Sequence, residues 1–388
     1  MSVVSPRVYL DHAATAPMLD AARDAWLDAS RAVGNPSSLH TSGRAARRIV
    51  EEARELIASK LRVRPGEIVF TSGGTEADNL AIKGMYWASK QRGIACSATE
   101  HHAVLDPVHW LTEHDGAEVS WLEVDELGRV RLDAFATLLA ERAEELALVS
   151  VMWANNEIGT IQPIADLAAM CRERDVAFHT DAVQALGMVP LDLEGIDAIT
   201  ISSHKIGGPF GVGALILDRG RKVTPVLHGG GQERDVRSGT LDAPAIAAFA
   251  VAVEHAVDHQ SQHAEEVSAL RDALIEGVRE AVPSAVLNGD RVDRLPGNVH
   301  FSFPGCEGDA LLMLLDAAGI DCSTGSACTA GIPEPSHVLL AIGVPEERAR
   351  GSLRFSLGRT STQTDVDALV AALPSAVERA SRAGSARR

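Results

Sequence analysis

Short apolar stretches alternate with amphipathic ones up to residue 217 of this chain. The apolar stretches, which lack the period of a helix, are 67–72, 93–98, 118–124, 146–154, 176–182, 198–203 and 211–217. Most of the segments between them favour helices, as in 43–61, where one face would carry Ala46, Ile49, Val50, Ala53, Leu56 and Ile57. Continuous apolar strands interleaved with helices predict an α/β fold with a largely parallel sheet covered on both faces.

The last two predicted strands, 198–203 and 211–217, are joined by a short glycine-rich link. A parallel crossover needs a dozen or more residues, so this pair is expected to be antiparallel.

The pattern changes near residue 245. One long helix is predicted over 243–282, followed by a strand at 298–303, a helix at 308–319, a strand at 352–358 and a final helix. This order predicts a large α/β domain followed by a smaller α+β C-terminal domain. A ligand site is expected in the cleft between the two.

Composition narrows the class of protein. The 388 residues carry a net charge of −17, which argues against general binding to nucleic acid or to anionic membranes. The five cysteines form no C-x-x-C pair, so neither a disulfide scaffold nor a metal site is expected. The sequence shows no signal peptide and no apolar run of membrane-spanning length, which predicts a cytoplasmic protein.

Polar residues cluster directly after the predicted strands, where ligands bind in open α/β sheets. They are Gly74 and Thr75; His101 and His102; Asn155 and Asn156; Asp181 and Gln184; and Ser202, Ser203, His204 and Lys205. Taken singly, several have simple structural readings. Thr75 and Asp181 could cap helices, and the histidine pair could be an ordinary polar loop.

Lys205 is unusual in its position. The chain has only five lysines among 36 basic residues, and Lys205 alone lies between a buried strand and a run of glycines. Neither a P-loop nor a dinucleotide fingerprint is present to explain it, because "GVGALI" lacks the third glycine and opens a strand.

The chemistry of these positions together suits pyridoxal 5′-phosphate. That cofactor needs a lysine for its aldehyde, a carboxylate for its pyridine nitrogen and a donor for its phenolic oxygen. Its phosphate needs backbone N–H and hydroxyl groups, and its flat ring needs a stacking partner. Each requirement has a candidate at a strand end.

Ten collinear motifs carry a family resemblance. They are "YLDHAAT", "GNPSSLHTSGR", "TSGGTEADNLAIKG", "TEHHAVLD", "NNEIGT", "HTDAVQALG", "SSHKIGGPFGVGAL", "RSGT", "STGSACTAG" and "RFSLGR". From about residue 8 to residue 360 the chain resembles the cysteine desulfurases of iron–sulfur-cluster and nitrogen-fixation type, within the class V aminotransferases. The resemblance implies pyridoxal-phosphate fold type I, with a mainly parallel seven-stranded sheet. It also implies a large cofactor domain over 15–259 and a small domain made of 1–14 and 260–388.

The resemblance assigns roles to matching positions. Lys205 would bind the cofactor covalently, His101 would stack on its ring and handle protons, and Asp181 and Gln184 would bind the pyridine nitrogen and ring hydroxyl. The phosphate would be held by Gly74, Thr75, Ser202 and His204, and by Thr240 of a neighbouring subunit in a homodimer. Asn155, which also borders the cofactor, and Arg354 would hold the substrate carboxylate. His12 departs from the family pattern, since related sequences often carry an aromatic residue there.

Cys328 selects the reaction. It lies among small and polar residues, "STGSACTAG", a composition that predicts a reactive cysteine on a mobile loop. By resemblance it is the nucleophile that removes the sulfur of L-cysteine as a persulfide and leaves L-alanine. Cys96, Cys171, Cys306 and Cys322 are instead interpreted as structural.

Two questions stay open at this point. A selenocysteine lyase or another class V aminotransferase-type enzyme would use the same scaffold. The sequence does not indicate the sulfur acceptor, which could be an iron–sulfur scaffold, a tRNA-thiolating enzyme or another sulfur carrier.

Overall fold

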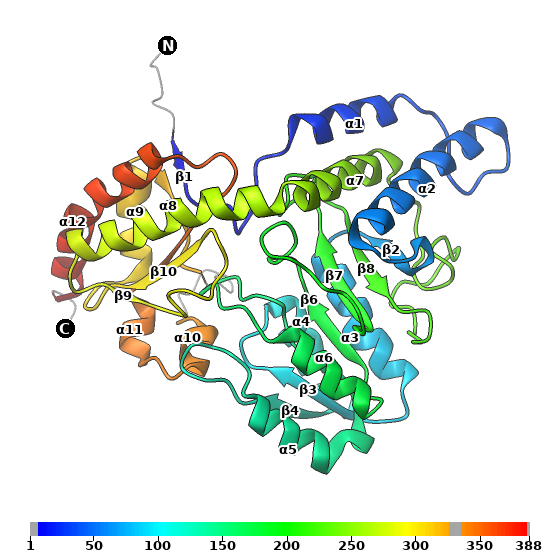
Figure 1. The fold of residues 1–388 in the computed structure, drawn as a ribbon, viewed down its shortest axis with the longest axis horizontal. Helices are drawn as coiled ribbons and strands as arrows, with labels where there is room; N and C mark the ends of the chain where they lie inside the picture. Colours follow the sequence, from blue (N-terminus) through cyan, green and yellow to red (C-terminus); the bar gives the residue numbers. More distant parts are fainter. Residues whose placement is uncertain (1–6, 326–334, 386–388) are drawn as a thin grey trace.

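A seven-stranded sheet forms the centre of the larger part of the molecule (Figure 1). The structure is a computed structural model that describes residues 7–325 and 335–385. The sheet has the order β2-β8-β7-β6-β5-β3-β4. Its strands are β2 (Ile68–Thr71), β3 (Gly93–Ser97), β4 (Glu118–Leu122), β5 (Leu146–Ser150), β6 (Phe178–Asp181), β7 (Ala198–Ser202) and β8 (Gly213–Leu217). All seven predicted strands are therefore present, and the predicted fold class is confirmed.

Strand β8 is the one reversed strand of this sheet. Strands β3 to β7 pair in parallel, whereas β8 is antiparallel to both β7 and β2. The predicted antiparallel pair is confirmed, with Ser202 opposite Gly213 at its closed end. The link between them includes Gly207 and Gly211, both at positive φ, so the chain turns back where a side chain would be strained.

Helices cover both faces of this sheet because its strands are apolar on both sides. Ile68 and Phe70 of β2 pack into one core with helices α2 (Thr41–Leu61), α5 (Leu132–Arg142), α6 (Ile164–Glu173) and α7 (Ala243–Asp258). Val69, between them, faces a second core with α3 (Gly74–Ala88) and α4 (His102–Asp115). Alternate side chains thus enter different cores, as expected for a strand buried on both faces. Helix α1 (Asp20–Ser30) lies on the outside, against α7.

The smaller part of the molecule has its own sheets and core. Its three-stranded sheet has the order β12-β10-β9, with β9 (Val286–Leu287), β10 (Asn298–Ser302) and β12 (Ser352–Ser356). The first strand of the chain, β1 (Val8–Tyr9), pairs in parallel with β11 (Ile320–Asp321). The helices here are α8 (Gln260–Ala281), α9 (Gly308–Ala317), α10 (His337–Ala341), α11 (Glu346–Arg350) and α12 (Gln363–Ser385).

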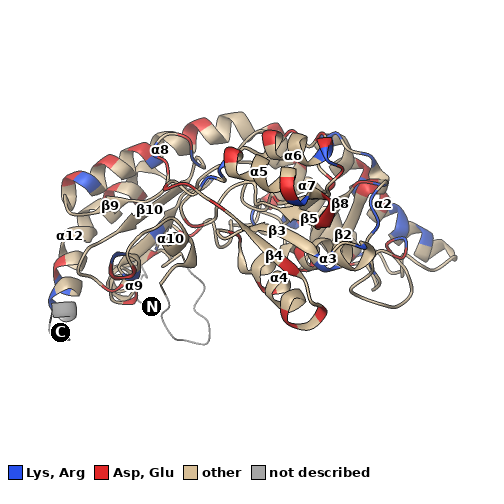
Figure 2. Ribbon diagram, turned by 90° about the horizontal axis from the view of Figure 1, so that it is seen from below, with Lys and Arg blue, Asp and Glu red and all other residues tan. Residues whose placement is uncertain are grey.

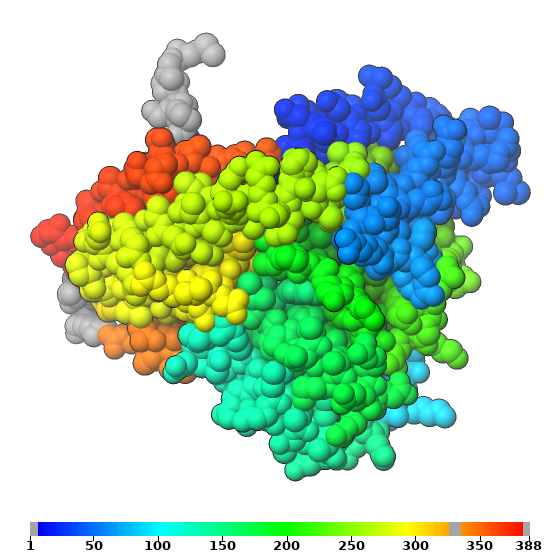
Figure 3. Space-filling view, viewed as in Figure 1, coloured from blue at the N-terminus to red at the C-terminus, as the bar shows by residue number. Residues whose placement is uncertain are grey.

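The prediction of one helix over 243–282 was wrong. The structure has two helices, α7 and α8, which meet at His259. The apolar pattern continues across this point because α7 packs on the large core and α8 on the small one. Figure 3 shows the two helices running along one face and bridging the parts of the molecule.

Charged residues lie mainly on the outer helices. In the ribbon of Figure 2, acidic residues are spread over α5, α6 and α8, with basic residues among them. Within the described residues, no helix is both long enough and apolar enough to cross a membrane.

Candidate active site

A cavity of about 400 Å³ lies at the carboxyl ends of the parallel strands. Residues of both parts of the molecule line it. They are Ala13, Ala14, Gly74, Thr75, Asp78, His101, His102, Ala103, Met152, Asn156, Glu157, Asp181, Val183, Gln184, Ser202, His204, Lys205, Ser323, Gly325, His337 and Arg354. Nine of the twelve site residues predicted from the sequence are therefore brought together here, and Asn155, Thr240 and Cys328 are the others.

Lys205 enters the cavity from the turn between β7 and β8. Its Nζ donates hydrogen bonds to the backbone oxygens of Ala13 at 2.6 Å and Ala14 at 2.9 Å. Burial lowers the pKa of Lys205 to about 8, and the charge of Arg354 acts in the same direction. An amine with such a pKa is partly neutral near pH 8, as nucleophilic and basic lysines need to be.

An anion site is built at the start of α3. The residue before the helix, Gly73, has no side chain to cap it, and Gly74 and Thr75 of the first turn line the cavity. The first N–H groups of a helix have no partner within the helix and are suited to binding an anion. Thr75 lies inside the first turn, so the reading of Thr75 as the helix cap is not supported. Ser202 borders the same cavity, and its buried Oγ has no hydrogen-bond partner among the described residues.

His204 completes this corner. Its Nδ1 lies 2.9 Å from Thr15 Oγ1, and its ring stacks on Phe210 at a centroid distance of 5.4 Å. Phe210 is nevertheless 68% exposed, which is unusual for a large apolar side chain beside a ligand cavity.

Two buried carboxyl groups lie side by side under the cavity. Asp181, at the end of β6, accepts a hydrogen bond from Val183 N at 2.8 Å. Burial, reinforced by the charge of Asp78, raises the pKa of Asp181 to about 8. Burial likewise raises the pKa of Asp78 to about 7, and its Oδ1 has no hydrogen-bond partner in the described structure. A cationic group placed beside them would restore both to the charged form.

Asp78 was not predicted from the sequence. The available signal was an acidic residue within the otherwise apolar face of the α3 helix, one turn after Gly74. Gln184, which was predicted, points into the same region and donates from Nε2 to Ala13 O at 2.9 Å.

His101 is the N-cap of α4 and also a wall of the cavity. Its Nδ1 accepts a hydrogen bond from Ala103 N at 3.0 Å, so the neutral ring carries its proton on Nε2. Desolvation, with a further contribution from Lys205, lowers the pKa of His101 to about 4. The histidine is therefore both a structural cap and a neutral hydrogen-bond donor in the cavity.

Arg354 reaches the cavity from β12 in the smaller part. It donates to Asp11 Oδ1 at 2.8 Å and to Asn156 O at 3.0 Å, while its buried Nε has no partner among the described residues. Asn155, paired with Arg354 in the sequence prediction, does not line the cavity. Its amide donates to Thr99 O and accepts from two backbone N–H groups, and the neighbouring Asn156 lines the cavity instead.

Glu157 is a further residue that sequence reasoning missed. It is 2% exposed, lines the cavity and accepts a hydrogen bond from Ser336 Oγ. A methyl group built on Gly325 would lie 3.4 Å from Glu157 Oε2 and 3.1 Å from His300 Nε2. Glu157 therefore lies beside both Gly325 and Ser336, which flank residues 326–334.

The four cysteines that the structure describes are buried, as expected for structural cysteines. Cys96, Cys171, Cys306 and Cys322 are free thiols buried in the protein. Burial raises the pKa of Cys322 to about 12, so that thiol stays protonated and inert near neutral pH. Cys328 lies outside the described residues.

Thr240 is exposed and does not line the cavity of its own subunit. Within the described residues, no group of three or more His, Cys, Asp or Glu side chains could hold a metal ion.

Comparison with known sequences adds a family match. A family model described as aminotransferase class-V matches residues 8–369. The chain is 55% identical to the IscS-like cysteine desulfurase of Mycobacterium tuberculosis, over 97% of this chain and 98% of that protein. It is 44% identical to the cysteine desulfurase IscS of Dictyoglomus turgidum, over 96% and 95% of the two chains.

Solved structures give a matching result. A NifS-like protein superposes with a TM-score of 0.89 at 35% identity, covering 96% of this chain and all of that one. DndA from Streptomyces lividans superposes with a TM-score of 0.76 at 40% identity, covering 90% and 99% of the two chains.

Proposed function

This chain belongs to the class V aminotransferase family and is a pyridoxal-phosphate-dependent cysteine desulfurase, and from that premise we propose how its residues act on L-cysteine. One observation carries the proposal. The amine of Lys205, the carboxyl of Asp181 and the open N-terminus of α3 border one cavity. An aldehyde, a ring nitrogen and a phosphate need these three partners at once.

The residues present fit the cofactor. The unpaired Ser202 Oγ and the first N–H groups of α3 would take its phosphate, together with Thr75 and His204. Asp181, whose pKa is raised while it lacks a cation, would pair with the pyridine nitrogen. Gln184 would reach the ring hydroxyl and His101 would cover the ring. When bound, pyridoxal phosphate supplies an aldehyde for the lysine and an electron sink for the substrate.

Proton transfer would fall to Lys205, and His101 would assist it through a hydrogen bond. Lys205 Nζ, with its lowered pKa, would take and return the proton at the α-carbon of the substrate. His101 is neutral and keeps its proton on Nε2, so it would donate a hydrogen bond inside the cavity rather than release that proton. Because His101 is held by the backbone of α4, its ring keeps one orientation during turnover.

Arg354 would bind the carboxylate of L-cysteine. A guanidinium meets a carboxylate through two parallel hydrogen bonds, and Asp11 and Asn156 already orient this one. We propose that Asn155 acts indirectly, by fixing the loop that contains Asn156. Its side-chain oxygen accepts hydrogen bonds from the backbone N–H groups of Glu157 and Ile158.

Cys328 would accept the sulfur. Its thiolate attacks the substrate sulfur, an S–S bond forms, the C–S bond breaks, and alanine leaves after its β-carbon is protonated. The persulfide then passes to a second protein. We propose an iron–sulfur scaffold or a tRNA-thiolating enzyme as that acceptor, in keeping with relatives named IscS.

A homodimer and a cytoplasmic location complete the proposal. Thr240 is exposed in its own subunit and would reach the cofactor phosphate of its partner. The exposed Phe210, beside His204, is explained if a partner subunit covers it.

The division into a domain over 15–259 and a domain of 1–14 with 260–388 is likewise our proposal. The separate large and small cores support it.

The proposal is tested by incubating the purified holoenzyme with L-cysteine and dithiothreitol. Alanine and sulfide should form in equal amounts. Cys328→Ser should abolish both while the visible absorbance of the lysine-bound cofactor is kept, and Lys205→Ala should lose that absorbance as well. Alanine formation that survives Cys328→Ser would refute the role of this thiol and favour the lyase alternative.

A further inference from the structure

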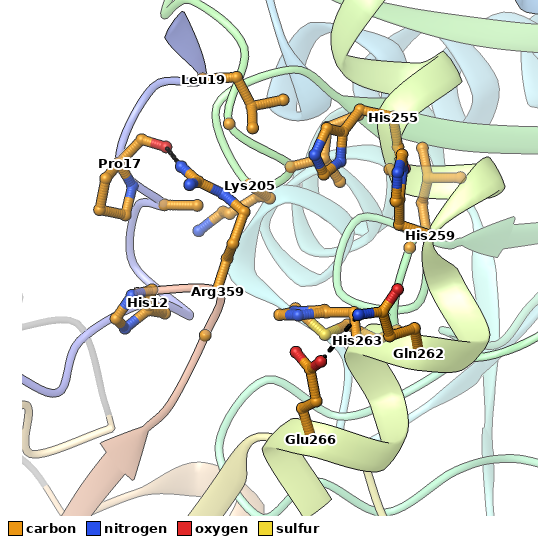
Figure 4. A pocket seen from close by; sticks show the side chains of 18 residues that line it. His12, Pro17, Leu19, Lys205, His255, His259, Gln262, His263, Glu266 and Arg359 are labelled. Atoms are coloured by element: carbon orange, nitrogen blue, oxygen red, sulfur yellow. Dashed lines mark hydrogen bonds between the residues drawn. The ribbon is translucent and has the colours of Figure 1, made fainter. Parts of the chain in front are cut away.

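A second cavity, of about 230 Å³, shares Lys205 with the cofactor cavity and is otherwise lined by different residues (Figure 4). We call it the histidine cavity. Its apolar lining includes Leu19, Leu186, Met188 and Ile206, and its polar lining consists of His12, Lys205, His255, His259, Gln262, His263, Glu266 and Arg359. The proposed desulfurase reaction uses none of these polar groups except Lys205.

Three histidines from one side of the cavity are spaced by four residues. His255 is on α7, His259 is the junction and His263 is on α8, so helical geometry puts them on one face. The rings of His255 and His259 stack with centroids 4.3 Å apart. His259 Nδ1 lies 3.0 Å from His255 O and must donate to it, which leaves Nε2 for a ligand.

The opposite side holds Arg359 and His12. Figure 4 shows Arg359 and His12 facing the histidines, with Lys205 between them. Arg359 donates one hydrogen bond to Pro17 O at 3.3 Å, and its remaining donors are available to a ligand. Glu266 is the one carboxylate in the lining, and Gln262 Nε2 donates to it at 2.9 Å.

Protonation of the histidines would add positive charge to a cavity that already holds Arg359. Burial lowers the pKa values of His12, His255 and His263, and in each case Arg359 and a neighbouring histidine lower them further. Three carboxylates act the other way: Asp11 on His12, Asp258 on His255 and Glu266 on His263. An anion in the cavity would favour the protonated form of these histidines and so raise their pKa values.

We propose that the histidine cavity binds a small organic oxyanion, a carboxylate or a phosphate carried on a short hydrocarbon body. The guanidinium of Arg359 and the Nε2 of His259 supply the hydrogen bonds to the oxyanion. The apolar side chains of Leu19, Met188 and Ile206 receive the hydrocarbon part. This site is separate from the substrate carboxylate site at Arg354.

Binding is linked to pH. An oxyanion favours the protonated histidines, so binding takes up protons and is tighter at pH 6 than at pH 8. The same anion would lie beside Lys205 and would raise the pKa of this lysine, against the effects of burial and of Arg354. The ligand would therefore also shift the pH dependence of the lysine-bound cofactor absorbance toward higher pH.

Calorimetric titration of the holoenzyme with sodium butyrate and with inorganic phosphate tests the proposal. Excess pyridoxal phosphate is present throughout, so that the cofactor's phosphate site is filled. Butyrate is expected to bind about tenfold more tightly at pH 6 than at pH 8. Arg359→Gln and His259→Gln are each expected to weaken it about tenfold at pH 6. The matched controls Arg350→Gln and His114→Gln, on α11 and α4, should leave it unchanged.

The two ligands distinguish the sources of the oxyanion. Tighter binding of butyrate indicates a carboxylate, and tighter binding of phosphate, lost in the same variants, indicates a phosphate ester. Binding that is independent of pH, or that survives both cavity variants, would overturn the proposal. The proposal would also be overturned if Arg354→Lys abolished binding while Arg359→Gln kept it, because that result would place the anion in the substrate site.

Discussion

Asp78 and Asp181 lie in one buried site, and in the cofactor-free protein both carboxyl groups are protonated over a wider pH range than usual. Burial raises both pKa values, to about 7 and about 8. In the unfolded chain both carboxyls titrate near pH 4. Between these limits the folded protein holds protons that the unfolded chain releases. The free energy of unfolding therefore falls as pH rises from about 4 to 8.

Replacing Asp78 by asparagine should remove its share of this pH dependence. In the cofactor-free protein, the melting temperature of Asp78→Asn relative to wild type should rise steadily between pH 5 and pH 8. Differential scanning calorimetry across this range measures it. A difference that does not change with pH would show that Asp78 is already charged in the fold. Asp106→Asn, at an exposed position on α4, is the control.

Asp181→Asn tests the carboxylate that faces the cofactor. The variant should keep the lysine-bound cofactor, since Lys205 is unchanged, but should release alanine about 100-fold more slowly. The reason is that an amide does not hold the pyridine nitrogen in its protonated form. Visible spectra and the rate of alanine formation are the measurements. A rate within twofold of wild type would exclude the assigned role.

Gly325 is held by two separate constraints. Its φ is +87°, and a methyl group there would meet the buried His300 Nε2 at 3.1 Å. Gly325→Ala should lower the free energy of unfolding by about 2 kcal/mol, from strain and crowding together. Gly305→Ala should cost only about 1 kcal/mol, because Gly305 has φ +78° with no described atom within 4 Å of the added methyl. Equal losses in urea unfolding would mean that close packing at Gly325 is unimportant.

The sequence reading of the site succeeded where a residue follows a strand. Lys205 and Asp181 could be placed because strand ends converge at one edge of the sheet. Asp78 and Glu157 could not be placed, since their position at the cavity depends on how helices and loops pack across the cleft. The choice between Asn155 and Asn156 fails for a related reason: adjacent residues point in different directions, and only the local backbone decides which one faces the cavity.

The elements themselves are joined by a buried ion pair between α2 and the segment before α7. Arg54 donates to both oxygens of Glu233 and to Ile68 O, and Glu233 also accepts from Phe70 N. Arg54 and Glu233 are both almost fully buried. Removing Glu233 leaves the buried charge of Arg54 with only Glu51, a half-exposed carboxylate 3.2 Å from its Nε, as an ion-pair partner, and this loss is expensive.

Glu233→Gln should therefore reduce the free energy of unfolding by about 3–5 kcal/mol, measured by urea denaturation. Arg54→Met combined with Glu233→Met should recover much of that loss, because no buried charge remains. Additive losses in the double variant would show that the two side chains do not act as a pair.

The sequence predicted the helices and strands better than the point at which one helix ends and the next begins. The seven strands were found because apolar runs bounded by polar residues are typical of buried strands. The break at His259 was missed because helical periodicity continues through it. What separates α7 from α8 is the change from one core to the other, which local periodicity does not encode.

For the whole molecule, subunit mixing tests the proposed dimer. Thr240→Ala and Lys205→Ala should each be nearly inactive as pure dimers. Mixed dimers should regain one complete site, because the intact Thr240 of one subunit meets the intact Lys205 of the other. Alanine formation in refolded mixtures, compared with unmixed samples, measures this. Mixtures no more active than the sum of their parts would contradict a shared site.

The N-terminal segment has a consequence for the order in which the enzyme is made. Asp11 orients Arg354, from which it is separated by 343 positions, and the backbone of Ala13 and Ala14 holds Lys205. Strand β1 pairs with β11, which is synthesised more than three hundred residues later. On the ribosome, residues 8–14 must therefore wait for residues 320–356 before they are fixed in place. Arg354 reaches its place in the active site only after that later stretch has been made.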